Sequence, residues 1–328
     1  ILHNLPYSSW LLTGDFDPSG NLWLGRQWSG GGLIKMNWPS PEALEPEFEE
    51  MWTKKDGLRN ANIWSIWAES QHRVWLGTEE GIFIKTQNDW IPIPHQSPDQ
   101  IYQAMYILPT TQGEVWVGTD KGIGKIKQGK YFPITTGTLL DETMVWTMHQ
   151  DSEGSIRVGT NSYGMYIIND GIINHLTIQS GLSGNSIYDI LEQPKGVFWF
   201  ANEYGIDRHI AHKSPLKAYF QSIRGNQTYN PKSKLPDFNI QSRLVLDVRT
   251  SNITSTEQKS NYREKIKRSS GQEMETQTIK FGEDRLEWVP TKSGDYTFEL
   301  VAFDQNLFQS EPAILKLKVI PPWYRNRT

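Results

Sequence analysis

One short motif recurs along the first two thirds of the chain, and its spacing limits the possible folds more than any other feature. In each copy a large side chain lies between apolar neighbours and is followed two positions later by a small residue, as in Leu22–Gly25. The large residues, called markers below, follow one another at intervals of 52, 41, 41 and 42 residues: Trp23, Trp75, Trp116, Arg157 and Trp199. A period of roughly 40 to 50 residues is typical of β-propeller blades.

Each copy also carries the signals of several short strands. An aromatic residue lies 11 to 14 residues before each marker, in a segment of alternating polarity: Trp10, Trp64, Tyr102, Trp146 and Tyr188. A glycine precedes four of the markers by three residues, where a tight turn needs positive φ: Gly20, Gly113, Gly154 and Gly196. The second copy has His72 at this position, which predicts a less regular turn. A further glycine and two more strand-like segments complete the copy.

We therefore expect five repeats of four antiparallel strands each. Units of this size are stable when they stack around an axis, and large side chains then fill the space between neighbouring sheets. On this interpretation the five markers are structural residues rather than ligand contacts.

At this level of detail the sequence resembles a known family. The pattern Asp-x-x-Gly, a marker, Gly-Thr and then Gly-Ile resembles the two-component regulator propeller repeat, and Asp17–Gly25 and Asp151–Gly154 carry it best. This resemblance covers about residues 8–215. The tail, with Gly294–Asp304, Ser310–Pro312 and Ile320–Tyr324, resembles the triple-tyrosine domain that follows such propellers.

The resemblance implies an all-β chain with three parts. These are a propeller over residues 1–215, an immunoglobulin-like β-sandwich over 216–322 and a juxtamembrane tail over 323–328. Propellers of the family have seven blades, so the five repeats would be part of a seven-bladed ring; a closed five-bladed ring is the alternative. The residues of the tail predict a sandwich by themselves, because Leu315, Leu317 and Val319 alternate with Lys316 and Lys318.

Composition and motifs give little sign of catalysis. The net charge of −4 and the 14 tryptophans argue against a nucleic-acid partner and against disorder, and the chain has no cysteine for a disulfide, a thiolate metal site or a nucleophile. His209 and His212 are three residues apart but stand in a non-helical context, so we expect no metal site. No cofactor motif is present, and no catalytic residue is predicted. Two carboxylates from different blades could still converge, which a sequence cannot show.

The loops after the second strand of each repeat are the best candidates for ligand binding. Propellers present these loops and the connections between blades on one face around the axis. A saccharide needs polar side chains for its hydroxyl groups and aromatic faces for the apolar side of its ring. The residues that combine these properties are Trp28, Glu79, Asp120, Asn161, Tyr163, Asn202 and Tyr204.

The leading hypothesis for function is the sensing region of a bacterial transmembrane receptor, on the periplasmic or extracellular side of the inner membrane. Its ligand would be a small molecule or an oligosaccharide. The resemblance implies a homodimer through the sandwich, a membrane helix downstream and a kinase, cyclase or DNA-binding output domain, and the chain shows no apolar stretch of about 18 residues itself. The alternatives are a propeller enzyme, either a lyase or a glycan hydrolase, and an interaction scaffold.

Overall fold

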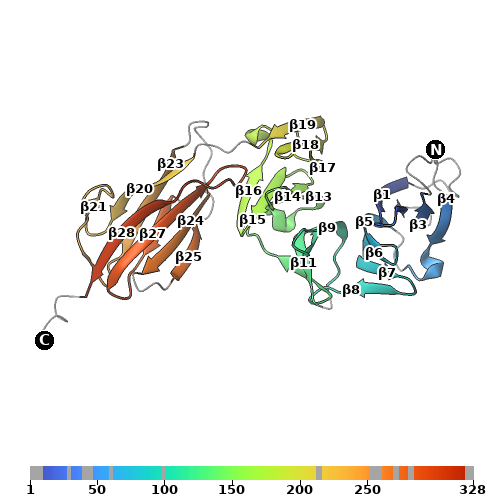
Figure 1. Ribbon diagram of the computed structural model, residues 1–328, viewed down its shortest axis with the longest axis horizontal. Coiled ribbons are helices and arrows are strands. Elements are labelled where there is room, and N and C mark those ends of the chain that lie inside the picture. The colour runs from blue at the N-terminus through green and yellow to red at the C-terminus, as the bar shows by residue number, and fades with distance from the viewer. Residues whose placement is uncertain are drawn as a thin grey trace. The chain divides into compact units, whose positions relative to one another are not determined.

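The computed structural model describes residues 10–27, 31–38, 47–58, 62–97, 100–211, 216–251, 261–268, 273–279 and 284–321 (Figure 1). The chain divides into two units. The first comprises Ile1–Ile168 and His175–Ile210, and the second comprises Asn169–Asn174 and Ala211–Thr328. The predicted fold class is confirmed, because the described residues form antiparallel sheets and three short 3-10 turns, η1 (Lys54–Asp56), η2 (Leu139–Glu142) and η3 (Ile178–Ser180).

Five small antiparallel sheets follow one another along the chain as propeller blades. The first blade contains β1 (Trp10–Phe16), β2 (Asn21–Gln27), β3 (Gly32–Asn37) and β4 (Glu47–Trp52), and the second contains β5 (Ile63–Ser70), β6 (Arg73–Thr78), β7 (Gly81–Thr86) and β8 (Trp90–Ile93). The third contains β9 (Ala104–Pro109), β10 (Val115–Thr119), β11 (Gly122–Lys127) and β12 (Lys130–Ile134). The fourth contains β13 (Val145–Gln150), β14 (Ile156–Thr160), β15 (Met165–Asn169) and β16 (Ile172–Leu176), and the fifth contains β17 (Ile187–Glu192), β18 (Val197–Asn202) and β19 (Gly205–Ile210).

The turns between first and second strands form where the sequence predicts them. Gly20, Gly113, Gly154 and Gly196 have φ between 75° and 88°, a region that side chains with a Cβ rarely adopt. The second blade differs as expected, because the pairing of β5 with β6 shifts between Ala68 and Ser70, next to the turn that contains His72.

The markers close these turns from within each blade. Trp23 Nε1 donates to Asp17 Oδ2 at 2.9 Å, and Trp75 Nε1 donates to Glu69 Oε2 at 2.7 Å. Each acceptor lies six residues before its marker, across the hairpin. A buried indole N–H needs such a partner, so one acidic residue both satisfies the donor and anchors the turn.

The first strands of the blades are the innermost elements. Each packs against the first strand of the next blade, in the order β1, β5, β9, β13 and β17. Hydrogen bonds join neighbouring blades here: Ala68 N donates to Asp15 Oδ2 at 2.8 Å, and Ile107 N donates to Ser65 Oγ at 3.0 Å. These inner strands surround the axis of the first unit.

The fifth blade has three strands in the described part of the chain, where the repeat predicts four. Beyond Ile210 the chain continues into the second unit, so no fourth strand follows β19 there. Trp199 is accordingly 37% exposed, whereas Trp23, Trp75, Trp116 and Arg157 are at most 8% exposed. The physical reason is that each marker packs toward the following blade, as Arg157 does against the ring of Phe198.

The second unit is a β-sandwich of two sheets. One sheet has the order β21 (Thr228–Tyr229), β20 (Lys217–Arg224), β23 (Leu244–Ser251) and β26 (Arg285–Trp288). The other has the order β22 (Phe238–Asn239), β28 (Ala313–Ile320), β27 (Gly294–Phe303), β24 (Asn261–Arg268) and β25 (Glu273–Ile279). The predicted strands are antiparallel, except that β22 pairs with β28 in parallel.

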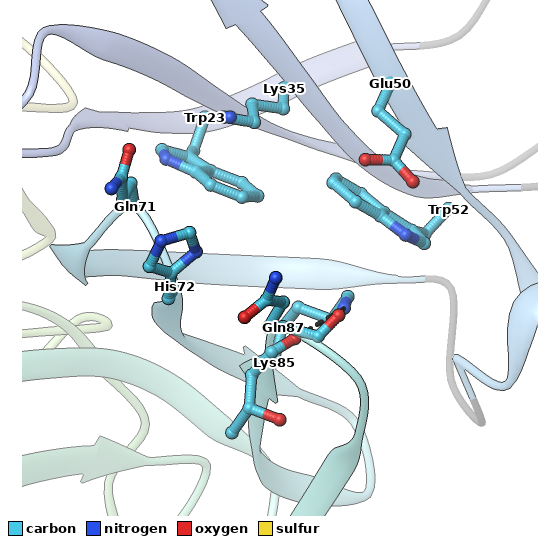
Figure 2. Close-up of a pocket in the computed structure, with 9 residues that line it drawn as sticks. Trp23, Lys35, Glu50, Trp52, Gln71, His72, Lys85 and Gln87 are labelled. Atoms are coloured by element: carbon cyan, nitrogen blue, oxygen red, sulfur yellow. Dashed lines mark hydrogen bonds between the residues drawn. The ribbon is translucent and has the colours of Figure 1, made fainter.

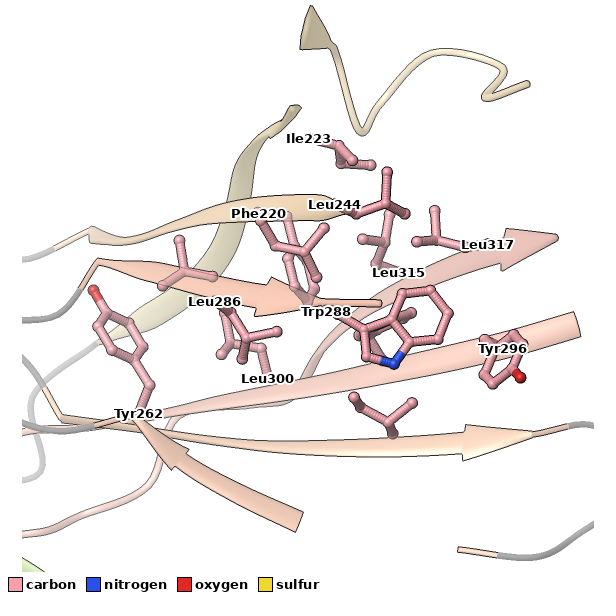
Figure 3. Close-up of a cluster of buried hydrophobic side chains, with 14 of the residues drawn as sticks. Phe220, Ile223, Leu244, Tyr262, Leu286, Trp288, Tyr296, Leu300, Leu315 and Leu317 are labelled. Carbon is pink, nitrogen blue, oxygen red and sulfur yellow. The ribbon is translucent and has the colours of Figure 1, made fainter. Parts of the chain in front are cut away.

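The sandwich core confirms the alternation in the sequence. Leu315, Leu317 and Val319 are buried and alternate with exposed lysines along β28. Figure 3 shows Trp288 among the aliphatic side chains of both sheets. Its indole meets the rings of Tyr296 and Phe298 edge to face, with centroids 4.8 and 5.0 Å away, an arrangement that favours the ring quadrupoles.

Candidate functional site on the loop face of the first unit

One end of the first unit carries both the loops between second and third strands and the segments that lead into each blade. Asn62 Nδ2 donates to Glu79 Oε1 at 2.9 Å, and Gln103 N donates to Asp120 Oδ1 at 3.1 Å. The later blades have equivalent contacts. In the fourth blade Asn161 N donates to the carbonyl oxygen of Met144 at 2.9 Å, and in the fifth blade Ser186 N donates to Glu203 Oε2 at 2.8 Å. We call this end the loop face.

The loops themselves are held by a repeated threonine contact. Thr78, Thr119 and Thr160 end the second strands, and each Oγ1 donates to the carbonyl of the glycine that begins the third strand, at 2.9, 3.0 and 2.7 Å. Those glycines, Gly81, Gly122 and Gly164, have positive φ, which allows the short reversal. The Gly-Thr of the motif therefore builds a fixed loop whose outer residues face solvent.

The structure separates the predicted ligand residues into two groups, and Trp28 lies outside the described residues. Glu79 and Asp120 accept the hydrogen bonds described above. Asn202 is buried, donates to Asp207 Oδ2 at 2.9 Å and accepts from Tyr204 N at 2.8 Å. Asn161 is exposed, and Tyr163 and Tyr204 are 46% and 78% exposed. These last three residues have the surface that a ligand needs.

Aromatic residues on the inner strands add to this face, and sequence reasoning named them only as a signal for the first strand of each repeat. The first strands carry a register shift near their start, which leaves Trp64, Trp146 and Tyr188 unpaired in β5, β13 and β17. Such a bulge re-aims a side chain. Tyr188 is half-exposed and meets Trp146 edge to face at 6.4 Å. The spacing of 11 residues before each marker was the signal for them.

Two of these bulge residues have free hydrogen-bonding capacity. Among the residues that the structure describes, the indole nitrogens of Trp64 and Trp146 are buried without a hydrogen-bond partner. A buried donor without a partner costs free energy.

The inner strands place acidic side chains from two blades, Asp15 and Asp189, where they act on Tyr106 of β9. Burial raises the pKa of Tyr106, and the negative charges of Asp189 and Asp15 raise it further. Burial likewise raises the pKa of Asp15, against the hydrogen bonds from the backbone of Ala68 and Phe16. The phenol of Tyr106 on β9 is thus influenced by the carboxylates of Asp15 on β1 and Asp189 on β17. This convergence bears on the enzyme alternative, which requires acidic groups from different blades.

The described part of the chain contains neither a cluster of metal ligands nor a membrane-spanning helix. No group of three or more histidine, aspartate or glutamate side chains there could hold a metal ion. His209 lies in β19 with its ring 6.1 Å from that of Phe200, while His212 is outside the described residues. Over the same residues, no helix has the length and apolarity required to cross a bilayer.

Comparison with known proteins identifies the fold. No family model and no curated protein matches the sequence. Among solved structures, the extracellular domain assigned to the hybrid two component system BT3049 from B. thetaiotaomicron matches with a TM-score of 0.55 and 17% identity, over 96% of this chain and 44% of that one. The extracellular domain assigned to the one component system BT4673 from B. thetaiotaomicron has a TM-score of 0.49 and 17% identity over the same shares.

A third solved structure is PorZ, a surface component of the type-IX secretion system of Porphyromonas gingivalis, with a TM-score of 0.47 and 14% identity over 96% of this chain and 46% of that one. The chain thus spans less than half the length of these three structures. At 17% identity, the similarity to the BT3049 domain shows a shared fold, which in this chain consists of propeller blades and a sandwich.

Proposed function

We propose that this chain is the ligand-sensing, extracytoplasmic region of a bacterial signalling receptor, and that the loop face binds a glycan. The observation that carries the proposal is the exposure of Tyr163 and Tyr204 on loops that internal hydrogen bonds hold in place. Rigid aromatic side chains on fixed loops lose little conformational entropy when a sugar ring stacks on them. The shared fold with an extracellular domain of a two-component system supports the sensing role.

Both ends of the series of blades favour a longer propeller in the complete receptor. Phe16 on β1 is 54% exposed, and Leu191 and Ile206 on the fifth blade are 51% and 72% exposed. These side chains lie on sheet faces that neighbouring blades cover elsewhere in the unit. We therefore favour an open arc whose ends meet further blades, as the predicted seven-bladed ring requires.

The sandwich is proposed to relay the signal as part of a homodimer. Its last strand, β28, ends at Ile320 and is followed by Pro321, which cannot donate to a sheet ladder. The predicted juxtamembrane tail, residues 323–328, lies outside the described residues. Ligand would act by binding more tightly to one of two arrangements of the paired sandwiches.

Titration calorimetry with a panel of neutral and acidic oligosaccharides tests the loop face. We expect one class to bind, and we expect Tyr163→Ala combined with Tyr204→Ala to weaken binding by about tenfold or more, because two stacking faces are lost. Tyr219→Ala is the matched control, since Tyr219 is 41% exposed on β20 of the sandwich. Unchanged affinity in the double variant would exclude this face.

The enzyme alternative rests on the acidic groups near Tyr106. A lyase or hydrolase that used them would release new reducing ends from the bound glycan, and Asp189→Asn would stop that release. We expect no release by the unmodified protein, measured by a reducing-sugar assay over many hours at high protein concentration. Steady release that disappears in Asp189→Asn would replace the sensor proposal with catalysis.

A further inference from the structure

The part of the loop face that carries the exposed tyrosines is acidic. The loops of the fourth and fifth blades, with their flanking residues and lead-in segments, are residues 135–144, 161–163, 177–186 and 202–207. They contain no lysine or arginine and four acidic residues: Asp141, Glu142, Glu203 and Asp207. On the third blade, Asp120 and Lys121 cancel in formal charge. The loop face around the fourth and fifth blades therefore carries negative charge.

Hydrogen bonds from uncharged groups hold these carboxylates in place. Asp141 accepts from Thr136 N and from Gly137 N, both at 2.8 Å. Glu203 Oε1 accepts from Asn185 N at 3.1 Å. A backbone N–H fixes the position of a carboxylate but, unlike a lysine or arginine partner, adds no positive charge to cancel it. The negative charge of these segments is thus both fixed and uncompensated by these donors.

Asp207 connects this charge to the loop of Tyr204. Its Oδ2 accepts from Ser183 N at 2.8 Å and from Asn202 Nδ2 at 2.9 Å. Asn202 Oδ1 in turn accepts from Tyr204 N at 2.8 Å. Charges act over about 10 Å at 0.1 M salt, so an anionic group on a sugar ring bound to Tyr204 would be repelled.

Cations of the first unit lie on other aromatic rings. Four of them lie 4.3 to 5.7 Å from the centroids of the marker indoles: Lys35 on Trp23, Arg73 on Trp75, Lys125 on Trp116 and Arg208 on Trp199. Figure 2 shows Lys35 beside Trp23 in a pocket between the first two blades, where Lys85 lies 5.2 Å from the centroid of Trp52. Positive charge that would neutralise an acidic ligand is thus engaged on these rings.

We propose that the loop face excludes acidic glycans, and that its ligand is a glycan without carboxylate or sulfate groups. The inference rests on the proposed glycan site and adds the charge of its ligand. The physical reason is that an anionic group would meet fixed charges of the same sign with no cation to offset them. Hydroxyl groups meet no such repulsion, and they can donate to the lone pairs that the carboxylates still have.

The test uses the full chain and four trisaccharides: cellotriose, maltotriose, mannotriose and galactotriose. Each is offered in its neutral form, with its C6 groups oxidised to carboxylates, and as the methyl ester of those carboxylates, which restores neutrality at similar size. Calorimetry is performed at about 10 mM and about 1 M salt, where the Debye length is roughly 30 and 3 Å.

We expect at least one neutral trisaccharide to bind, and its carboxylate form to bind about tenfold or more weakly at low salt. The methyl ester should recover most of the affinity, and high salt should narrow the difference. Equal or tighter binding of the carboxylate form overturns the inference, as does a methyl ester that binds as weakly as the carboxylate. If no form of any trisaccharide binds, the glycan site itself falls and this inference with it.

Charge variants at exposed positions separate repulsion from poor fit. Glu142→Lys should reduce the low-salt penalty of the carboxylate form several-fold, and Lys121→Glu should increase it, while the neutral form binds unchanged. Glu311→Lys is the matched control, because it makes the same change in net charge at an exposed residue of the second unit. Effects of Glu142→Lys no larger than those of Glu311→Lys would refute a local origin of the selectivity.

Discussion

Arg157 Nε donates to Asp151 Oδ2 at 3.1 Å, in the position where Trp23 Nε1 of the first blade donates to Asp17 Oδ2 at 2.9 Å. Both acceptors lie six residues before their markers. The fourth blade thus keeps the hydrogen bond and replaces the indole with a guanidinium group, whose planar face packs on Phe198 with its carbon 3.6 Å from the ring centroid. A buried ion pair results, with side chains 2% and 3% exposed.

This pair should be sensitive to the loss of one partner alone. Asp151→Asn leaves the guanidinium group buried without a counter-charge, and we expect the first unit to lose about 3–5 kcal/mol of unfolding free energy. Urea unfolding followed by tryptophan fluorescence measures the change. Arg157→Trp should cost much less, because an indole N–H would again face Asp151. Lys195→Ala is the control, because Lys195 and its partner Glu153 are both largely exposed. A loss of unfolding free energy in Lys195→Ala as large as that in Asp151→Asn would contradict the argument.

His149 should make the stability of the first unit depend on pH. Burial lowers the pKa of His149, although Glu192 Oε2 at 3.8 Å opposes this. The unfolded chain, with a histidine pKa of about 6.5, therefore takes up a proton more readily than the folded chain. The stabilisation that neutral His149 gives the folded state is complete above a pH of about 6.5. It declines as the pH falls toward the lowered pKa of His149 in the folded state. Unfolding midpoints of His149→Gln between pH 5 and 7.5 should lack this decline; identical curves for both proteins would show that His149 does not titrate on unfolding.

Gly164 should be the least replaceable turn residue on the loop face. An alanine Cβ there would lie 2.2 Å from the carbonyl oxygen of Leu176, whereas at Gly113, with similar φ, nothing lies within 4 Å. Gly113→Ala should cost about 1–2 kcal/mol for its left-handed backbone alone. Gly164→Ala should cost clearly more, and should also weaken glycan binding through the neighbouring Tyr163. Thermal unfolding of both variants provides the comparison, and equal shifts in Tm would rule out the steric contribution.

The sandwich core should depend on Phe298, which is fully buried on β27. Phe298→Ala removes a ring that packs on Trp288 and leaves a cavity, so we expect a loss of about 3–5 kcal/mol in the unfolding of the second unit. Near-ultraviolet circular dichroism during urea unfolding can follow the Trp288 environment. Ile314→Ala on β28, where the side chain is 51% exposed, is the control and should change stability little. A larger loss of unfolding free energy in Ile314→Ala than in Phe298→Ala would contradict this assignment of the core.

Much of the fold could be predicted because its signals are local in sequence. The interval between markers and the glycines with positive φ are properties of single hairpins, and so is the alternation along β28. A turn that needs φ near 80° selects glycine whatever the rest of the chain does, and a half-buried strand selects alternating polarity. These features determine the order of the strands within a blade before any blade packs on another, although the three strands of the fifth blade were not predicted.

The candidate sites depended on contacts that only the tertiary structure decides. Sequence could not show that Asp120 accepts from the segment leading into its blade and that Asn202 bonds within its own hairpin. Nor could it show that Tyr163 and Tyr204 remain exposed, because each outcome depends on which groups come within reach in three dimensions. Nor could it show that Trp23 and Gln87, which come from different blades, line one pocket. Repeats fix the path of the backbone within a blade, but the space between two blades is set by how their side chains pack together, and that packing has no period in the sequence.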